Sequence, residues 1–152
     1  MKTKTILIVS LALMLSFSSF SQSYNSGIGG RGGVYNGISY KQFINSTDAI
    51  EIVGAFYYES LFLGGMFQMH NPIPEVHNLF WYYGFGAHVG FFGNRFKPDE
   101  PGTRIGASGN LGLEYKFDRI PVTIGLDVIP ALNIISHTNF WIGGGVAVRY
   151  VF

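Results

Sequence analysis

The sequence of 152 residues contains no cysteine and few charged residues. Lys, Arg, Asp and Glu make up 12% of it, about half of the roughly 25% that is usual for soluble domains. The lack of cysteine excludes a disulfide-stapled secreted domain and a lipoprotein anchored through cysteine. Ten basic residues against nine acidic ones form no basic face, which argues against a nucleic-acid partner. The hydrophobic fraction of 47% excludes intrinsic disorder.

The first 21 residues have the layout of a secretory signal peptide. Two lysines give a positive start, an apolar run covers residues 6–17, and serines stand at −3 and −1 of a cleavage site before Gln22. The run is shorter than the roughly 20 apolar residues that a transmembrane helix needs, and no later segment is long enough. We therefore expect a cleaved signal peptide, residues 1–21, and a single domain, residues 22–152.

The remaining chain alternates with a period of two, which is typical of β-strands. Between residues 108 and 117, for example, the odd positions from Leu111 to Phe117 are apolar, whereas the even positions are polar or glycine. A soluble sandwich covers its outer face with charged side chains, and this chain has too few of them. We therefore expect a barrel whose apolar face meets lipid and whose interior is polar.

Seven strands follow from the alternation, and barrel parity requires one more. The seven segments are residues 27–43, 49–58, 61–70, 79–92, 105–117, 121–134 and 139–152. A single-chain bacterial barrel has an even number of strands. Asn36-Gly37 is a strong hairpin signal and splits the first segment, with a misread connection at 71–78 as the alternative. The expected fold is all-β, a single antiparallel up-and-down transmembrane β-barrel of eight strands.

This topology places the connections on two sides of the membrane. With a periplasmic C-terminus, the short turn at Asp118-Arg119 becomes periplasmic. The charged segment 94–104, the turn at residues 59–60 and the loop at His137 then form the outer edge, as expected for long extracellular loops.

Alternation also predicts which charged side chains point into the barrel. The inward set has four positive residues, three negative residues and one histidine. It comprises Arg31, Lys41, Glu51, His88, Glu114, Lys116, Asp127 and Arg149. Because the interior of an eight-stranded barrel is just filled by side chains, and unpaired buried charge is costly, we expect a network of ion pairs that holds the barrel closed. A proton or solute path is the alternative.

Other candidate sites in the sequence have simpler explanations. His70 and His77 flank a segment with Glu75 that offers a weak surface metal site. We expect these residues instead to be solvated loop residues without a metal. Several aromatic residues near strand ends fit interfacial girdles better than a carbohydrate platform. They are Tyr57, Tyr58, Trp81, Tyr82, Tyr83, Trp141 and Tyr150. We expect no catalytic, cofactor or metal site.

Three segments carry a resemblance to a known group: the signal peptide end at residues 19–22, the strand at 111–117 and the alternating last strand at 143–152. With them the chain resembles small eight-stranded outer-membrane β-barrel proteins of Gram-negative bacteria. Tyr150 and Phe152 on the last strand are similar to the C-terminal assembly signal of such barrels. The resemblance implies an outer-membrane location with outer-membrane lipids, periplasmic chaperones and the barrel-assembly machinery as partners. A surface ligand on the loops is a further option.

The resemblance leaves the activity open. Outer-membrane lipid A deacylases are eight-stranded barrels with a histidine and a serine two positions apart, but here His137 is followed by Thr138 and Asn139. A nucleophile and its base need hydrogen-bond reach and an orienting acid. We therefore expect a structural or surface-interaction role without catalysis. The alternatives are a lipid A-modifying enzyme, a narrow channel, and a soluble lipocalin-like binder with its apolar face inward.

Overall fold

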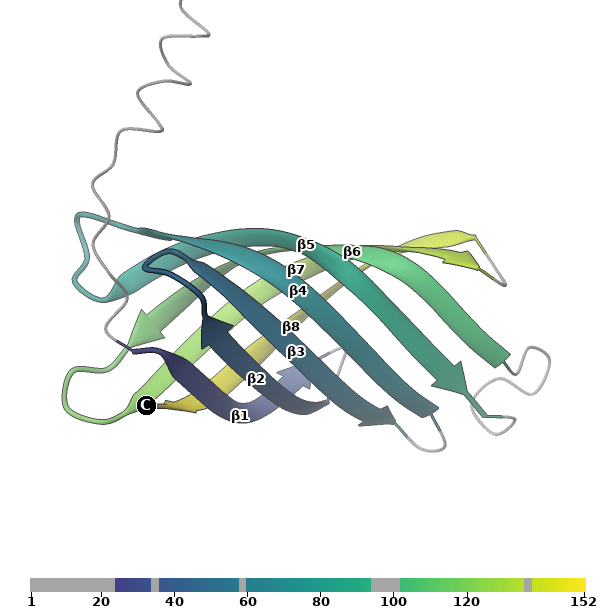
Figure 1. Ribbon diagram of the computed structural model, residues 1–152, viewed down its shortest axis with the longest axis horizontal. Coiled ribbons are helices and arrows are strands. Elements are labelled where there is room, and N and C mark those ends of the chain that lie inside the picture. Colours follow the sequence, from purple (N-terminus) through teal and green to yellow (C-terminus); the bar gives the residue numbers. More distant parts are fainter. Residues whose placement is uncertain (1–23, 34–35, 58–59, 94–101, 136–137) are drawn as a thin grey trace, which may run out of the picture.

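The computed structural model describes residues 24–33, 36–57, 60–93, 102–135 and 138–152. Neighbouring strands pair antiparallel in sequence order and β8 returns to β1, which closes the barrel (Figure 1). The strands are β1 (Ser26–Gly33), β2 (Gly37–Phe43), β3 (Asp48–Tyr57), β4 (Ser60–Pro72), β5 (Leu79–Phe92), β6 (Gly102–Lys116), β7 (Val122–Ile135) and β8 (Asn139–Val151). The expected all-β, eight-stranded up-and-down barrel is confirmed. In the described ranges, no helix is long and apolar enough to cross a bilayer.

The hairpin signal in the first segment is confirmed, and one loop boundary is corrected. Asn36 lies between β1 and β2, so the long first segment is two short strands. The charged segment 94–104 was predicted as a loop, yet β6 already begins at Gly102 and buries Arg104. The alternation of β6 extends past Ile105 to Arg104, whose side chain takes an inward position.

The barrel has two distinct ends. The Phe152 end carries Phe152 and the connections 44–47, 73–78 and 117–121, whereas the opposite Arg104 end carries the connections that follow β1, β3, β5 and β7. In Figure 1 the C-terminus and the β6–β7 connection lie together at the left. The predicted outer loops at 59, 94–101 and His137 join strands at the Arg104 end and lie outside the described residues.

Strand length differs around the wall. β1 and β2 have 8 and 7 residues, whereas β4 to β8 have 13 to 15 residues each. In Figure 1, β1 and β2 are the short arrows at the front, and the long strands continue past them. The wall is therefore taller on the β4–β8 side than at the β1–β2 hairpin.

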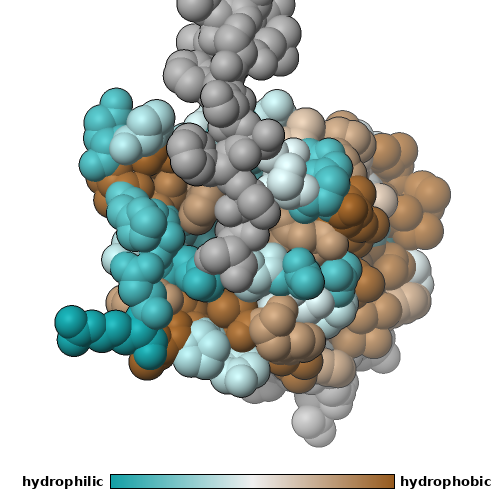
Figure 2. Space-filling view, turned by 60° about the vertical axis from the view of Figure 1, so that its left-hand side comes forward, coloured by the Kyte–Doolittle hydropathy of each residue, from teal (hydrophilic) through white to brown (hydrophobic). Residues whose placement is uncertain are grey.

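The outer face is apolar and the interior is polar. Large side chains such as Phe85, Leu126 and Ile142 expose 64%, 58% and 65% of their surface. Figure 2 shows hydrophobic residues over the flank at the right and hydrophilic ones on the end turned toward the viewer. Buried positions hold many polar groups, among them Lys41 and Arg149 at 0% exposure. This arrangement overturns the lipocalin-like alternative, which requires the apolar face to point inward.

Inward glycines permit the tight curvature of the wall. A Cβ built on Gly86 would collide with the main chain of Gly65 on β4, and one on Gly29 with the main chain of Val148 on β8. Only glycine fits where neighbouring main chains approach this closely. Gly65 itself has open space around the same position, because it lies on the outer face.

Candidate functional site

The main cluster of polar side chains lies inside the barrel and collects one charged residue from each of six strands. Arg31, Lys41, Glu51, Glu114, Asp127 and Arg149 come from β1, β2, β3, β6, β7 and β8. We call these six residues the charge network. Each takes an inward position of its strand, and each is at most 6% exposed.

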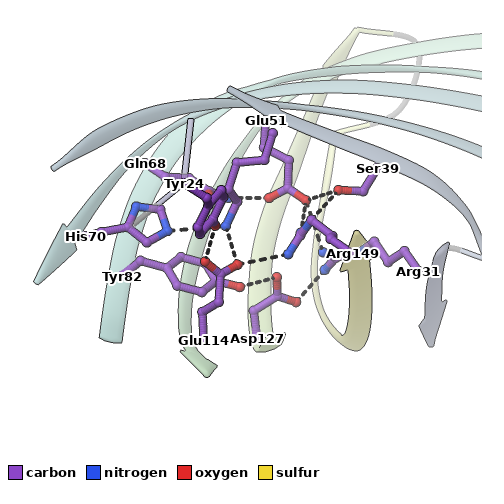
Figure 3. A network of polar contacts seen from close by, with 11 residues as sticks. Tyr24, Arg31, Ser39, Glu51, Gln68, His70, Tyr82, Glu114, Asp127 and Arg149 are labelled. Atoms are coloured by element: carbon purple, nitrogen blue, oxygen red, sulfur yellow. Dashed lines mark hydrogen bonds and ion pairs between the residues drawn. The ribbon is translucent and has the colours of Figure 1, made fainter. Parts of the chain in front are cut away.

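Arg149 lies at the centre of the charge network (Figure 3). Its Nη2 pairs with Glu51, and its Nη1 donates to Glu114 Oε2 at 3.1 Å. Its Nε donates to Ser39 Oγ at 2.8 Å, and Ser39 in turn donates to Glu51 Oε1 at 2.6 Å. One guanidinium therefore links β8 to β2, β3 and β6 across the lumen.

Lys41 lies beside Glu114 in an aromatic surrounding. Its Nζ donates to Glu114 Oε2 at 2.9 Å and contacts His70 Nε2 at 3.2 Å. It also lies 4.5 Å from the centroid of the Tyr82 ring, within the range of a cation–π contact. The ammonium group is thus enclosed by one carboxylate and two ring systems.

Arg31 and Asp127 form a further ion pair of the charge network. Tyr82 donates its hydroxyl to the other carboxylate oxygen of Asp127 at 2.9 Å, and Arg31 Nη1 lies 3.8 Å from Glu51 Oε1. Gln68 donates to the second oxygen of Glu51.

Tyr24, just before β1, reaches into the lumen from the Phe152 end. Its hydroxyl donates to Glu114 Oε1, and its ring packs edge-on against Phe43 with centroids 5.1 Å apart. Burial and the negative charge of Glu114 raise the pKa of the Tyr24 phenol well above its ordinary value. The phenol therefore stays protonated and remains a hydrogen-bond donor.

The charge network is neutral and its acceptors are saturated. Three cations face three carboxylates, and all six carboxylate oxygens accept at least one hydrogen bond. Buried ions are tolerated only with such pairing and hydrogen bonding. The arrangement can cross-link six strands, and it fills the lumen at this level.

Two residues of the predicted inward set lie apart from the charge network. Lys116 ends β6 at the Phe152 end and is half-buried. Its side chain forms no ion pair with any described residue. The prediction that Lys116 joins the lumen ion pairs is therefore wrong, because Lys116 is the last residue of β6 and lies at the end of the barrel.

His88 belongs to a second group of buried polar side chains, near the Arg104 end, that contains no acidic residue, lysine or arginine. Its Nδ1 lies 2.6 Å from Ser108 Oγ, and its Nε2 lies 2.8 Å from Asn133 Oδ1. Asn133 Nδ2 donates to Asn139 Oδ1 at 2.6 Å, and the Phe62 ring stacks on the imidazole at 5.4 Å. We call Ser108, His88, Asn133 and Asn139 the His88 cluster.

The hydrogen bonds of the His88 cluster set the roles of its atoms. Since Asn133 donates to Asn139, its oxygen faces His88 and accepts from Nε2–H. In a neutral imidazole with its proton on Nε2, Nδ1 accepts from the Ser108 hydroxyl, which is the relation of a general base to a nucleophile. Ser108 and His88 are both only 5% exposed, so the pair is shielded from the barrel surface.

Sequence reasoning missed several neutral members of the lumen. Tyr82 was expected in an interfacial girdle, but it is fully buried and bonds Asp127. His70 was expected as a solvated loop residue, but it is 2% exposed and stacks on Tyr82 with centroids 4.9 Å apart. Ser39, Gln68 and Tyr24 were not singled out. The alternation contained the signal, because Gln68 and His70 occupy alternate positions of β4, and Tyr82 has the same parity as the inward His88 on β5.

The proposed surface metal site is not assembled. His70 lies in the lumen, whereas the His77 side chain is 82% exposed and lies 3.6 Å from Asp118. Within the described ranges, no group of three histidine or acidic residues is placed to hold a metal ion. Of the predicted girdle, Trp81 and Tyr83 do face outward and stack at 5.3 Å. Tyr58 and His137 lie outside the described residues.

No protein-family model, curated protein or solved structure matches this chain.

Proposed function

We propose that this protein is an integral outer-membrane β-barrel with a structural or surface-interaction role. The observation that carries the proposal is the polarity of the wall, with large apolar side chains outside and paired charges inside. Soluble monomers rarely expose contiguous apolar patches larger than a few hundred Å². A membrane barrel needs an outward apolar band around a polar interior.

The geometry of the strands supports the same proposal. A tilted strand crosses the hydrocarbon layer with about 9–11 residues, and β4 to β8 have 13 to 15. A closed barrel satisfies its main-chain hydrogen bonds between strands, as the absence of water in a bilayer requires.

Residues near the two ends of the chain support export and assembly in the outer membrane. The signal-peptide pattern of residues 1–21 would direct export. Tyr150 and Phe152 expose 55% and 62% of their surface on the outer side of the last strand, where an assembly machinery could read them. In this orientation the Phe152 end faces the periplasm, and the loops at the Arg104 end face outward and would carry any surface ligand.

The charge network favours a sealed barrel over a channel. Its six charged side chains bond one another across the lumen, and an eight-stranded barrel has room for little else. Planar-bilayer recordings should show no conductance steps. Regular steps from the purified protein would support the channel alternative instead.

The proposal is tested by membrane insertion of a polarity variant. Leu126→Arg places a charge on the outer face of β7, where arginine at the bilayer midplane costs about 2–4 kcal/mol. We expect the heat-modifiable, folded band in the membrane fraction to fall strongly. Ile44→Arg, at an exposed position in the connection at the Phe152 end, should leave that band unchanged. Equal folding of both variants, or native protein in the periplasmic fraction, would contradict membrane insertion.

A second candidate function, acyl transfer at Ser108, is favoured by the hydrogen bond from Ser108 to His88. It is tested with an alkyl fluorophosphonate that reacts with activated serines. Labelling of the folded protein that disappears in Ser108→Ala would establish this activity. No labelling would leave the His88 cluster with a structural role.

A further inference from the structure

A hollow of about 350 Å³ opens at the Phe152 end beside the β6–β7 connection. This volume lies within the range of about 300–1,000 Å³ that is usual for ligand sites. Figure 1 shows that the β6–β7 connection and the C-terminus share this end. The hollow combines two cationic side chains, Lys116 and Arg119, with an apolar lining.

Neither cation forms an ion pair with a described residue, and with Asp118 in the same lining the charged side chains of the hollow keep one net positive charge. The three cations and three carboxylates of the charge network balance one another, so the charge of Lys116 at the end of the barrel is not part of that balance. Across the described ranges, neither Lys116 nor Arg119 forms a side-chain hydrogen bond or ion pair. Two positive groups therefore line one hollow without a partner.

Two acceptors in the same hollow already have donors. Asp118 Oδ1 accepts from Asn78 Nδ2 and lies 3.6 Å from His77 Nε2. The carbonyl oxygen of Phe152 accepts from the main-chain N–H groups of Asn25 and Ser26 at 3.2 and 2.9 Å. An incoming anion would thus meet the two cations without displacing these bonds.

Apart from Tyr24, Asp118 and the two cations, the lining is apolar and continues into the outer face. Phe117, Ile120, Pro121 and Val151 line the hollow together with Phe152. Ile120 and Phe152 are 51% and 62% exposed, so the hollow borders the apolar band. A ligand with an anionic head and a hydrocarbon tail could place each part against matching chemistry.

We propose that the hollow binds the phosphodiester headgroup of an anionic phospholipid in the membrane leaflet at the Phe152 end. Lys116 and Arg119 contact the phosphate oxygens, and the acyl chains lie along the apolar band beside Ile120. The proposal rests on the membrane location proposed above. It adds a lipid preference that membrane insertion alone does not require.

The test compares lipids bound to the full mature protein. The barrel is folded into vesicles of phosphatidylglycerol mixed equally with phosphatidylcholine, extracted in mild detergent, and its retained lipids are counted by native mass spectrometry. The test variant is Lys116→Gln with Arg119→Gln. The charge-matched control is Arg95→Gln with Lys97→Gln, in the connection that joins β5 to β6 at the other end.

We expect the native protein and the control to retain phosphatidylglycerol over phosphatidylcholine. The test variant should lose roughly thirtyfold of that preference, which is what two cations near a membrane surface contribute. Equal retention of both lipids by the native protein would overturn the proposal, and so would an equal loss in both variants. Displacement of the lipid by millimolar glycerol 3-phosphate would show an anion site and overturn the lipid assignment.

Heat-modifiable migration of the same samples separates the two proposals. A folded barrel that shows no lipid preference overturns only the phospholipid site. A protein that does not enter the vesicles overturns the membrane location itself.

Discussion

The two polar clusters of the lumen use opposite strategies in the same narrow space. The charge network at the Phe152 end joins three cations and three carboxylates from six strands. The His88 cluster at the Arg104 end joins neutral groups from β5, β6, β7 and β8. Both consist of buried polar side chains, so burial alone does not distinguish them.

The difference lies in what each cluster loses when one member is removed. Removing one partner of a buried ion pair leaves an uncompensated charge and costs about 3–5 kcal/mol. Removing a neutral partner costs about 1–3 kcal/mol, because the remaining buried group loses a hydrogen bond but carries no full charge. The charge network should therefore dominate the stability of the barrel, and the His88 cluster should contribute little.

The largest effect is expected for Arg149→Gln. This change leaves Glu51 and Glu114 without their shared guanidinium, so the free energy of unfolding should fall by about 3–5 kcal/mol. The measurement is urea unfolding in vesicles, followed by the heat-modifiable band. Arg119→Gln removes an arginine outside the charge network and, in vesicles of phosphatidylcholine alone, which supply no anionic lipid, should change stability by less than about 0.5 kcal/mol. An equal loss of stability in both variants would show that the charge network contributes no more to stability than a surface charge does.

An intermediate effect is expected for Gly86→Ala, which tests the wall between the two clusters. The added methyl group would collide with the main chain of Gly65, and overpacking of this kind costs about 1–3 kcal/mol. Gly65→Ala on the outer face meets open space and should be tolerated. The same urea titration applies, and a tolerated Gly86→Ala would show that the strands can separate at this level.

The smallest effect is expected for Ser108→Ala in the His88 cluster. It removes one hydrogen bond to His88 Nδ1, and the free energy of unfolding should fall by about 1 kcal/mol. Ser46→Ala, in the exposed connection between β2 and β3, serves as the control. A loss as large as that of Arg149→Gln would show that the neutral cluster, too, is essential to the barrel.

The sequence alone predicted most of the wall and part of the lumen. Alternation and the Asn36-Gly37 signal were sufficient to predict eight strands. The direction of a side chain in a strand depends only on whether its position is odd or even. The same parity assigned Arg31, Glu51 and Arg149 to the interior, where the structure places them.

Parity says nothing of where a strand ends or which inward residues meet. Lys116 has the parity of Glu114 but lies past the level of the charge network. Arg149 and Ser39 are 110 positions apart, and their contact depends on the register of β8 against β1. Tyr82 was assigned to the interfacial girdle because it is aromatic, although the alternation of its own strand placed it inside the barrel. Pairing across a closed barrel depends on shear and tilt, which one sequence does not display.

The position of Arg149 on the last strand also bears on how the barrel forms. Its partners Glu51 and Ser39 lie 98 and 110 residues earlier in the chain, and such distant contacts form late and slowly. Until β8 docks on β1, Glu51 on β3 lacks its contact with Arg149. An incomplete barrel of seven strands is thus penalised electrostatically as well as by its open edges, so closure should be abrupt and populated intermediates few.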